Sequence, residues 1–379
     1  MFFKRQDYPI GLDISDFSLK FVQLYKKANK IGIQSFGKLM LEKGIIENNH
    51  IKDMDTFIVR LKELIDNPKF GRVTSKRVVV CLPEPKTFIK LIKIPRDKKL
   101  DEEHIEREIK KYIPISPDET YYDWQTISKN EEEKTVLVGV SPKVFVDQYI
   151  EAIEGAKLSL IATEIESVSI VRSLLKEESA NNIGENSKNY GIIDIGANRS
   201  SMFVYAKNTI LFNISIPISG EKITDKIAKE LNILRKKAEL AKIICGIDKS
   251  RCEGIVALKI SESIKNMMLR INDVLDFHGE NFSEYGKIDN LIICGGGANI
   301  NSLDKELEKS TNIKSYIGNP FNNIDIISAV ALKKMFDEYK LTKGQASNDK
   351  TFTILQNDSL AYCTAIGLAL REIFKEGSK

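Results

Sequence analysis

The sequence lacks the segments that carry a protein into or across a membrane. No run of about 18 apolar residues, the length that a membrane-spanning helix needs, occurs anywhere in its 379 residues. The N-terminus has Lys4, Arg5 and Asp7 where a secretory signal would have its apolar stretch. We therefore expect a protein that neither crosses nor leaves the membrane by itself.

Cysteine and histidine are scarce, and their spacing does not suit a metal site. The five cysteines are an odd number, and no two have the short CxxC spacing of a structural zinc site or a redox motif. His50, His104 and His278 lie far apart among polar neighbours, which predicts surface positions. A reducing cytoplasm is the compartment that this cysteine usage favours.

A large excess of one charge is also missing. The 57 basic and 53 acidic side chains leave a net charge of +4, without one long basic block, which argues against a nucleic-acid-binding protein. Apolar residues make up 42% of the chain and charged residues 29%, as in globular proteins. Because one core rarely serves a chain of this length, we expect two or three lobes.

The chain opens with an apparent β-meander. Strands are predicted at Ile10–Asp13, Leu19–Tyr25 and Ile31–Met40, with Asp16 in the first turn. A helix at about 51–66 and a buried strand at Arg77–Leu82 follow. These elements predict the first part of a first lobe, residues 1–83.

The stretch from 84 to 160 differs in character and predicts an inserted small α+β subdomain. It contains expected strands at 87–94, 121–128 and 135–140 and expected helices at 101–111 and 142–156. A helix over Glu164–Lys176 and a polar loop at 180–189 would return the chain to the first lobe over 161–189.

A second lobe, predicted over 190–340, repeats the opening pattern. Strands are expected at Tyr190–Ile195, Ser201–Ala206 and Thr209–Ile216, followed by a lysine-rich helical region and a strand at Asn290–Cys294. Residues 341–379 would form an exposed loop, over 341–357, and a small-residue helix that returns to the first lobe. Duplication of a β-meander predicts a two-lobed α/β fold.

Each meander carries an aspartate on its first strand, Asp13 and Asp194. Two such hairpins facing each other across a cleft suit a metal–triphosphate, because turn amides donate to phosphate oxygens and carboxylates bind Mg²⁺ directly or through water. Lys20 would add positive charge to the phosphates. An aspartate in a single hairpin more often just starts a turn. Around the second turn, close backbone approach and hydrogen-bond donors are predicted from Gly196, Ala197, Asn198 and Ser200.

One further segment suits the nucleoside part of such a ligand. Gly295, Gly296 and Gly297 follow a buried strand, where a flat ring or a phosphate can press against bare backbone. Glu239 and Lys242 are three residues apart on a predicted helix, a spacing that by itself suits a surface ion pair.

Taken in order, these segments resemble the actin-like ATPase superfamily, which includes actin, heat-shock chaperone ATPases, sugar kinases and FtsA. The resemblance implies a ribonuclease H-like duplicated fold and the cofactors ATP and Mg²⁺, with Asp13 and Asp194 near the metal and Glu239 and Lys242 around the adenosine. It places Ser15, Asp16, Ser18 and Lys20 in the first phosphate loop. The five segments that match the signatures are Ile10–Lys20, Thr163–Ser169, Ile192–Ser201, Ile293–Ala298 and Ala361–Ala369.

Within the superfamily the chain is similar to the PilM family of type IV pilus assembly proteins, over nearly its whole length. The match is carried by Arg107–Ser116, Tyr121–Gln125, Ile216–Thr224 and Gly318–Ile324. It implies binding of the cytoplasmic N-terminal tail of PilN, a link to the pilus motor ATPases and to twitching motility, and a place at the inner face of the cytoplasmic membrane, held there by partners. Self-association is compatible with it.

The resemblance also sets expectations for chemistry. If ATP is hydrolysed, slowly, Asp194 and Glu166 would take the catalytic roles, with Glu166 orienting water. Ser15 and Asp16 depart from the family pattern of glycine and a small polar residue, so the first phosphate loop has less freedom and one more negative charge.

Three alternatives remain open on sequence alone. An FtsA-like division protein shares the fold and an insert, although the ending Arg371–Lys379 is too short and charged for an amphipathic membrane helix. A sugar or acetate kinase would need a substrate base in the first lobe, where this chain has the insert. A scaffold with a decayed nucleotide site is the third.

Overall fold

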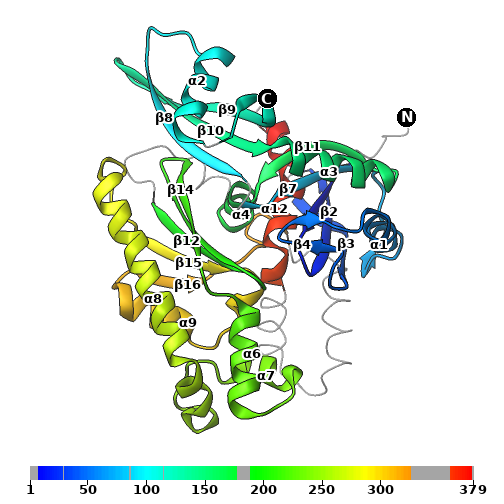
Figure 1. Cartoon of the computed structure of the whole chain (residues 1–379), viewed down its shortest axis with the longest axis vertical. Coiled ribbons are helices and arrows are strands. Elements are labelled where there is room, and N and C mark those ends of the chain that lie inside the picture. Colours follow the sequence, from blue (N-terminus) through cyan, green and yellow to red (C-terminus); the bar gives the residue numbers. More distant parts are fainter. Residues whose placement is uncertain are drawn as a thin grey trace. The chain divides into compact units, whose positions relative to one another are not determined.

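A computed structural model of the chain describes residues 7–28, 30–84, 87–113, 115–176, 188–325 and 359–377. Among these, 7–176, 321–325 and 364–377 belong to a first compact unit, and 188–320 and 359–363 to a second. The predicted loop at 341–357 and most of the one at 180–189 lie outside the described residues. Figure 1 shows the elements in sequence order, from the blue strands of the first unit to the red helix α12.

The first unit is built on a six-stranded sheet in the order β11-β7-β1-β2-β3-β6. The predicted meander pairs antiparallel, while β7 lies parallel to β1 and β11 parallel to β7. β1 is buried along its whole length, as expected for a central strand covered on both faces. The strands are β1 (Ile10–Ile14), β2 (Ser18–Lys27), β3 (Lys30–Met40), β6 (Phe70–Gly71), β7 (Arg77–Leu82) and β11 (Ser159–Ile165).

Helices and one small hairpin complete the main core of this unit. Asp53 caps α1 by accepting from the Thr56 amide, and Phe57, Leu61 and Leu64 face inward. α3 packs into the same core through Tyr149. The elements are β4 (Ile46–Glu47), β5 (His50–Ile51), α1 (Met54–Asp66), α3 (Lys143–Gly155), α4 (Glu166–Leu174), η6 (Leu360–Tyr362) and α12 (Cys363–Gly377), of which η6 and Cys363 belong to the second unit.

One prediction for this region is wrong. The helix predicted over Glu164–Lys176 begins two residues later than expected. Glu164 and Ile165 end strand β11, and α4 begins at Glu166. The backbone is held extended because β11 pairs with β7, from Arg77 to Leu82. This pairing outweighs the local helical pattern.

A three-stranded antiparallel sheet, in the order β8-β10-β9, forms a separate small core with α2. Asp101 caps α2, with acidic residues in its first turn and lysines in its last, which suits the helix dipole. Ile105 and Ile109 of α2 pack on Val136 and Val138 of β10. The elements are β8 (Phe88–Pro95), α2 (Glu102–Tyr112), η2 (Pro117–Glu119), β9 (Thr120–Lys129) and β10 (Glu133–Pro142).

The second unit is built on a five-stranded sheet in the order β14-β13-β12-β15-β16. β12, β13 and β14 are the predicted second meander, and β15 and β16 run parallel to β12. The strands are β12 (Tyr190–Ile195), β13 (Ser200–Ala206), β14 (Thr209–Ile216), β15 (Asn290–Cys294) and β16 (Lys314–Ile317).

The predicted lysine-rich helical region consists of three α-helices and short helical turns. His278 on the longest of them is 4% exposed, so its predicted surface position is wrong. The helices of this unit are α6 (Gly220–Leu231), α7 (Arg235–Ile244), η3 (Cys252–Gly254), α8 (Ile255–Asn281), η4 (Ser283–Tyr285), η5 (Gly296–Ala298) and α9 (Leu303–Thr311).

The strand orders confirm the predicted duplication. The order β11-β7-β1-β2-β3 in the first unit is repeated as β16-β15-β12-β13-β14 in the second, with the same pattern of parallel and antiparallel pairs. Asp13 and Asp194 therefore occupy corresponding points, next to the end of the central strand. No helix within the described ranges has the length and apolar character that crossing a bilayer requires.

Candidate functional site

The first predicted hairpin holds a close ion pair. Asp13 on β1 and Lys20 on β2 are direct cross-strand partners, and Lys20 Nζ lies 2.6 Å from Asp13 Oδ2. The turn between them is closed by Ser15, whose amide and hydroxyl both donate to the Ser18 carbonyl. Ser15 Oγ also accepts from the Ser18 amide, so the side chain stiffens the turn.

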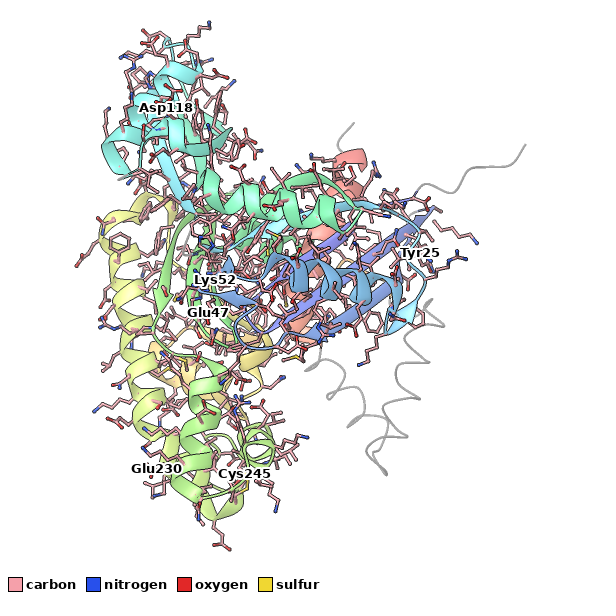
Figure 2. The ribbon with its side chains drawn as sticks, turned by 45° about the vertical axis from the view of Figure 1, so that its right-hand side comes forward. Tyr25, Glu47, Lys52, Asp118, Glu230 and Cys245 are labelled. Carbon is pink, nitrogen blue, oxygen red and sulfur yellow. A yellow bond between two sulfur atoms is a disulfide. The ribbon has the colours of Figure 1, made fainter. Side chains whose placement is uncertain are left out.

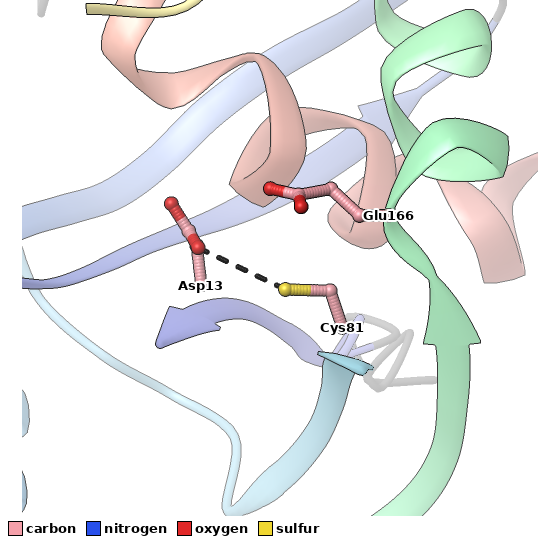
Figure 3. Close-up of side chains that lie close together, drawn as sticks. All are labelled: Asp13, Cys81 and Glu166. Carbon is pink, nitrogen blue, oxygen red and sulfur yellow. Dashed lines mark hydrogen bonds between the residues drawn. The ribbon is translucent and has the colours of Figure 1, made fainter. Parts of the chain in front are cut away.

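Two more side chains converge on Asp13. Cys81 extends from β7, and its Sγ lies 3.8 Å from Asp13 Oδ1. Glu166 is the first residue of α4, and one ligand atom from each of Asp13, Cys81 and Glu166 falls within 4.8 Å of the others. Figure 3 shows the three side chains coming together from different elements. Thr364 Oγ1, on α12, lies 3.4 Å from Glu166 Oε1 and donates to it.

The negative charges of Asp13 and Glu166 raise the pKa values of the two groups beside them, Lys20 and Cys81. Burial alone would lower the pKa of Lys20, but Asp13, by attraction and a hydrogen bond, and Glu166, by attraction, raise it above its usual value. Burial, together with the charges of Asp13 and Glu166, raises the pKa of the Cys81 thiol well above normal. Lys20 is therefore a fixed cation at neutral pH, and Cys81 is a neutral thiol.

Asp16 has a structural partner in the same unit. Its Oδ1 accepts from the backbone amide of Asn49, in the turn between β4 and β5, at 2.9 Å. Two residues later the amide of Ile51 donates to Gln148 Oε1 on α3, also at 2.9 Å. The turn of the first hairpin is thus connected through the β4–β5 hairpin to the helix that follows β10.

The second hairpin repeats the first. Cys294, the cross-strand partner of Asp194 on β15, has its Sγ 3.7 Å from Asp194 Oδ1. The turn is closed by the Gly196 amide, which donates to the Arg199 carbonyl. The carbonyls of Gly196 and Ala197 accept from the first amides of α6. Ser200 anchors the base of the turn through a 2.7 Å hydrogen bond from its Oγ to the Ile218 carbonyl.

The glycine run lies directly beside this hairpin. Gly295 has φ +84°, and a Cβ there would overlap Asp194 Oδ1. A Cβ on Gly297 would lie 2.6 Å from Ile195 Cγ2, and one on Gly220 would lie 3.0 Å from Gly297. Only glycine lets three backbone segments approach this closely. They form a bare backbone surface beside Asp194.

The spaced pair on α7 is buried at its basic end. Lys242 is 2% exposed, and its Nζ lies 2.7 Å from Glu239 Oε2 and 2.9 Å from Thr224 Oγ1. Lys242 Nζ also lies 3.7 Å from the position that a Cβ on Gly220 would take. The ion pair that the spacing predicted is present, and Glu239 is partly exposed, but Lys242 is not on the surface: its Nζ points into the unit and donates to the Gly220 carbonyl.

The predicted residues gather into one group in each unit. Asp13, Ser15, Ser18, Lys20 and Glu166 lie around the first hairpin, whereas Asp16 turns to Asn49. The second group contains Asp194, Gly196, Ala197, Asn198, Ser200, Glu239, Lys242, Gly295, Gly296 and Gly297.

Sequence reasoning missed Cys81 and Cys294. Each lies on the strand parallel to the one that bears the aspartate, 68 and 100 residues away, and no local pattern marks such a neighbour. Thr224 was also missed, because it lies on α6, 18 residues before the Lys242 side chain that it contacts. The only sequence signal was a cysteine that follows the apolar run of β7 and another that follows the apolar run of β15.

The donor set of the first hairpin suits a hard divalent cation. Carboxylates are the ligands that Mg²⁺ prefers, and Asp13 and Glu166 supply two of them in close proximity. The neutral thiol of Cys81 is a poor ligand for Mg²⁺. A soft metal would need the thiolate, which burial and the neighbouring negative charges disfavour.

The duplicated sheets, with a matching aspartate hairpin in each, have the actin-like ATPase fold. Among solved structures, the chain is similar to the PilM–PilN type IV pilus biogenesis complex, with a TM-score of 0.74 and 20% identity over 96% of this chain and 98% of that one. It is also similar to the ethanolamine utilization protein EutJ from Carboxydothermus hydrogenoformans, with a TM-score of 0.52 and 13% identity over 96% and 90%.

The sequence also matches the family of the type IV pilus assembly protein PilM over residues 11–373. The chain belongs to this family.

Proposed function

We propose that this protein is a nucleotide-responsive adaptor of a type IV pilus machine. The observation that carries the proposal is the pair of equivalent aspartate hairpins, at Asp13 and Asp194, in a chain of the PilM family. Duplicated hairpins of this kind supply the carboxylates and turn amides that a metal–nucleotide requires.

The proposed ligand is ATP with Mg²⁺, held with Asp13 and Asp194 near the metal. When bound, Mg²⁺ would neutralise phosphate charge and ATP would stabilise a closed arrangement of the lobes. Lys20, fixed as a cation, would exchange part of its contact with Asp13 for a phosphate oxygen. Gly295, Gly296 and Gly297 would offer bare backbone to the nucleoside, with Glu239 and Lys242 beside them. Glu166 would orient a water molecule, and we expect hydrolysis to be slow.

The proposed partner is the cytoplasmic N-terminal tail of a PilN-like membrane protein. This is supported by family membership and by the likeness to a structure of a PilM–PilN complex. The adaptor would link the inner-membrane platform to the motor ATPases and so to twitching motility. Its place would be the cytoplasm, at the inner face of the membrane.

Calorimetry on three proteins tests the proposal. ATP with Mg²⁺ is titrated into wild type, Asp194→Ala and Asp225→Ala, the last an exposed aspartate on α6 outside both hairpins. A synthetic PilN tail from the same genome is then titrated with and without nucleotide. We expect saturable ATP binding that Asp194→Ala abolishes and Asp225→Ala keeps, and a tail affinity that changes with ATP.

The other outcomes are equally informative. Tail binding without ATP binding would show a scaffold whose nucleotide site no longer works. ATP binding without tail binding would favour a cytoskeletal or kinase-like relative. Absence of both would overturn the proposed adaptor.

A further inference from the structure

One end of the second unit exposes an unusual number of large aliphatic side chains. Leu234, between α6 and α7, is 74% exposed, and Leu258 on α8 is 72% exposed. Leu240 and Ile244 are one turn apart on α7, and Ile255 precedes Leu258 by three residues, so each pair shares a helix face. We call these five residues the aliphatic tip.

Two links fix the parts of the aliphatic tip next to one another. Cys245, at the end of α7, and Cys252, just before α8, lie side by side with their Cα atoms 5.9 Å apart; they are joined by a disulfide in this structure and would be neighbouring thiols in a reducing cytoplasm. Lys259 on α8 pairs with Glu230 at the end of α6 at 3.3 Å. Figure 2 shows Glu230 and Cys245 at the same end of this unit. The five exposed side chains therefore lie around one end of this unit, where α6 ends and α8 begins.

The charge around the aliphatic tip is positive after the ion pairs are accounted for. Between 229 and 259, the carboxylates of Glu230, Glu239 and Asp248 each pair with a basic side chain, and Arg235 pairs with Glu221 and Asp225. Among the described residues from 229 to 259, one exposed acid, Glu253, and four lysines form no ion pair. These are Lys229, Lys236, Lys237 and Lys249.

The composition of this surface distinguishes two kinds of occupant. Protein interfaces are enriched in aromatic residues, Met and Arg and are depleted of Lys. The aliphatic tip has Leu and Ile surrounded by unpaired Lys, with no aromatic side chain among its five members. Aliphatic groups that enter the acyl boundary, with lysines at headgroup level, are the pattern of peripheral binding to anionic lipid.

We propose that the aliphatic tip is a docking surface for the anionic surface of a lipid bilayer. Leu234, Leu240, Ile244, Ile255 and Leu258 enter the boundary between headgroups and acyl chains, and the four lysines bind acidic headgroups. This contact is direct, and it is independent of ATP and of any tail peptide.

Flotation of the full chain with lipid vesicles tests the proposal. The vesicles contain phosphatidylcholine alone or equal parts of phosphatidylcholine and phosphatidylglycerol, and the buffer has low or high salt. We expect binding to the anionic vesicles at low salt, weaker binding at high salt and much weaker binding to phosphatidylcholine.

Two double variants separate the contributions. Leu234→Gln with Leu258→Gln removes aliphatic contact, and Lys236→Gln with Lys237→Gln removes charge; each is expected to weaken partitioning about tenfold or more. The matched controls are Val59→Gln, an exposed aliphatic on α1, and Lys26→Gln with Lys27→Gln, adjacent exposed lysines on β2. Both controls keep wild-type partitioning.

Several results would overturn the proposal. These are equal binding to both kinds of vesicle, no binding to anionic vesicles, or binding that the tip variants retain. If vesicles do not bind and sedimentation velocity shows concentration-dependent dimers that the leucine variant abolishes, the tip is a protein interface instead. The lysine pair lies on the surface, so that variant tests the idea even if the leucine variant does not fold.

Discussion

At the scale of single residues, the buried charged groups of the two hairpins and of α7 are matched to close partners. Asp13 and Asp194 each face a neutral thiol from the adjacent parallel strand, and Asp13 also has Lys20. A buried charge without a partner costs several kcal/mol, on the order of 3–5, so removing one member of such a pair is expensive. The same reasoning applies to Lys242, whose amine is satisfied by Glu239 and Thr224.

Lys242→Met should lower stability by about 1–3 kcal/mol, because Glu239 is partly exposed and recovers some solvation. It should also weaken the proposed ATP binding, since the amine lies beside Gly220, whose backbone packs against Gly297. Urea unfolding and calorimetry measure the two effects. Lys236→Met, on the exposed face of α7 and without an ion pair among the described residues, is the control and should change stability by less than about 0.5 kcal/mol.

His278 should make stability depend on pH. Burial beside Phe212 and Phe282 lowers its pKa, which Glu284 only partly offsets, and its Nε2 has no hydrogen-bond partner within the described residues. The unfolded chain therefore takes up the proton at a higher pH than the folded chain. The contribution of neutral His278 is complete above the unfolded pKa of about 6.5 and is lost as the pH falls below it.

The test compares unfolding free energies on both sides of this range. Wild type should lose stability between about pH 7.5 and pH 5.5, and His278→Phe should lose less, because the charge that must be buried is gone. His104→Gln, which alters a less buried histidine, should retain the wild-type slope. An identical slope in wild type and His278→Phe would contradict this account.

At the scale of secondary-structure elements, close packing of helices on strands depends on glycine. Gly11 on β1 lies against the backbone of α12 at Ala365 and Ala369, and Gly367 on α12 lies against the Ser169 carbonyl of α4. Arg172 of α4 donates to the Gly367 carbonyl at 2.9 Å and also pairs with Glu164. These contacts fix Glu166 at the start of α4 with respect to Asp13.

Gly367→Ala should destabilise the protein by about 3 kcal/mol or more, because the new methyl would overlap backbone that cannot move independently. Gly279→Ala, in α8, provides a matched control. A Cβ there meets nothing within 4 Å, so the change should stabilise the protein by about 0.5–1 kcal/mol through helix propensity. Chemical denaturation measures both. Similar effects from the two substitutions would show that the crossing of α4 and α12 is not tightly packed.

At the scale of the whole molecule, the proposed function requires that the nucleotide affect the partner site. A route within the first unit leads from Asp16 to Asn49, and from Ile51 to Gln148 on α3. α3 follows β10 without a loop, and so the first hairpin is joined to the three-stranded sheet, beside which we propose that the tail binds. The coupling free energy between two ligand sites is typically about 1–3 kcal/mol.

Asp16→Ala and Gln148→Ala should each reduce the effect of ATP on tail affinity toward unity, while the tail affinity without ATP stays near wild type. Calorimetry with and without nucleotide gives the coupling factor for each variant. Gln125→Ala, an exposed glutamine on β9, should leave that factor unchanged. Full coupling in the Asp16 and Gln148 variants would rule out this route without affecting the proposed binding of ATP or PilN.

Much of this architecture could be predicted from the amino-acid sequence. The two meanders, their aspartates, the glycine run and the α+β stretch between them follow from short-range patterns that repeat or alternate over a few residues. The order of these segments was enough to indicate an actin-like protein of the PilM family. Hydrophobic alternation and turn chemistry are local, and they act before any distant contact forms.

Tertiary structure decided the rest, because it depends on which distant segments pack together. Pairing with β7 made an extended strand of a segment with a helical pattern, and parallel crossovers brought Cys81 to Asp13 and Cys294 to Asp194. Folding buried Lys242 of the spaced Glu239–Lys242 pair, and hydrogen bonding directed Asp16 to Asn49. The sequence by itself determined the local elements and their repetition. The partner of each buried charge was determined only by the fold, since charges at any separation along the chain can meet once the strands are paired.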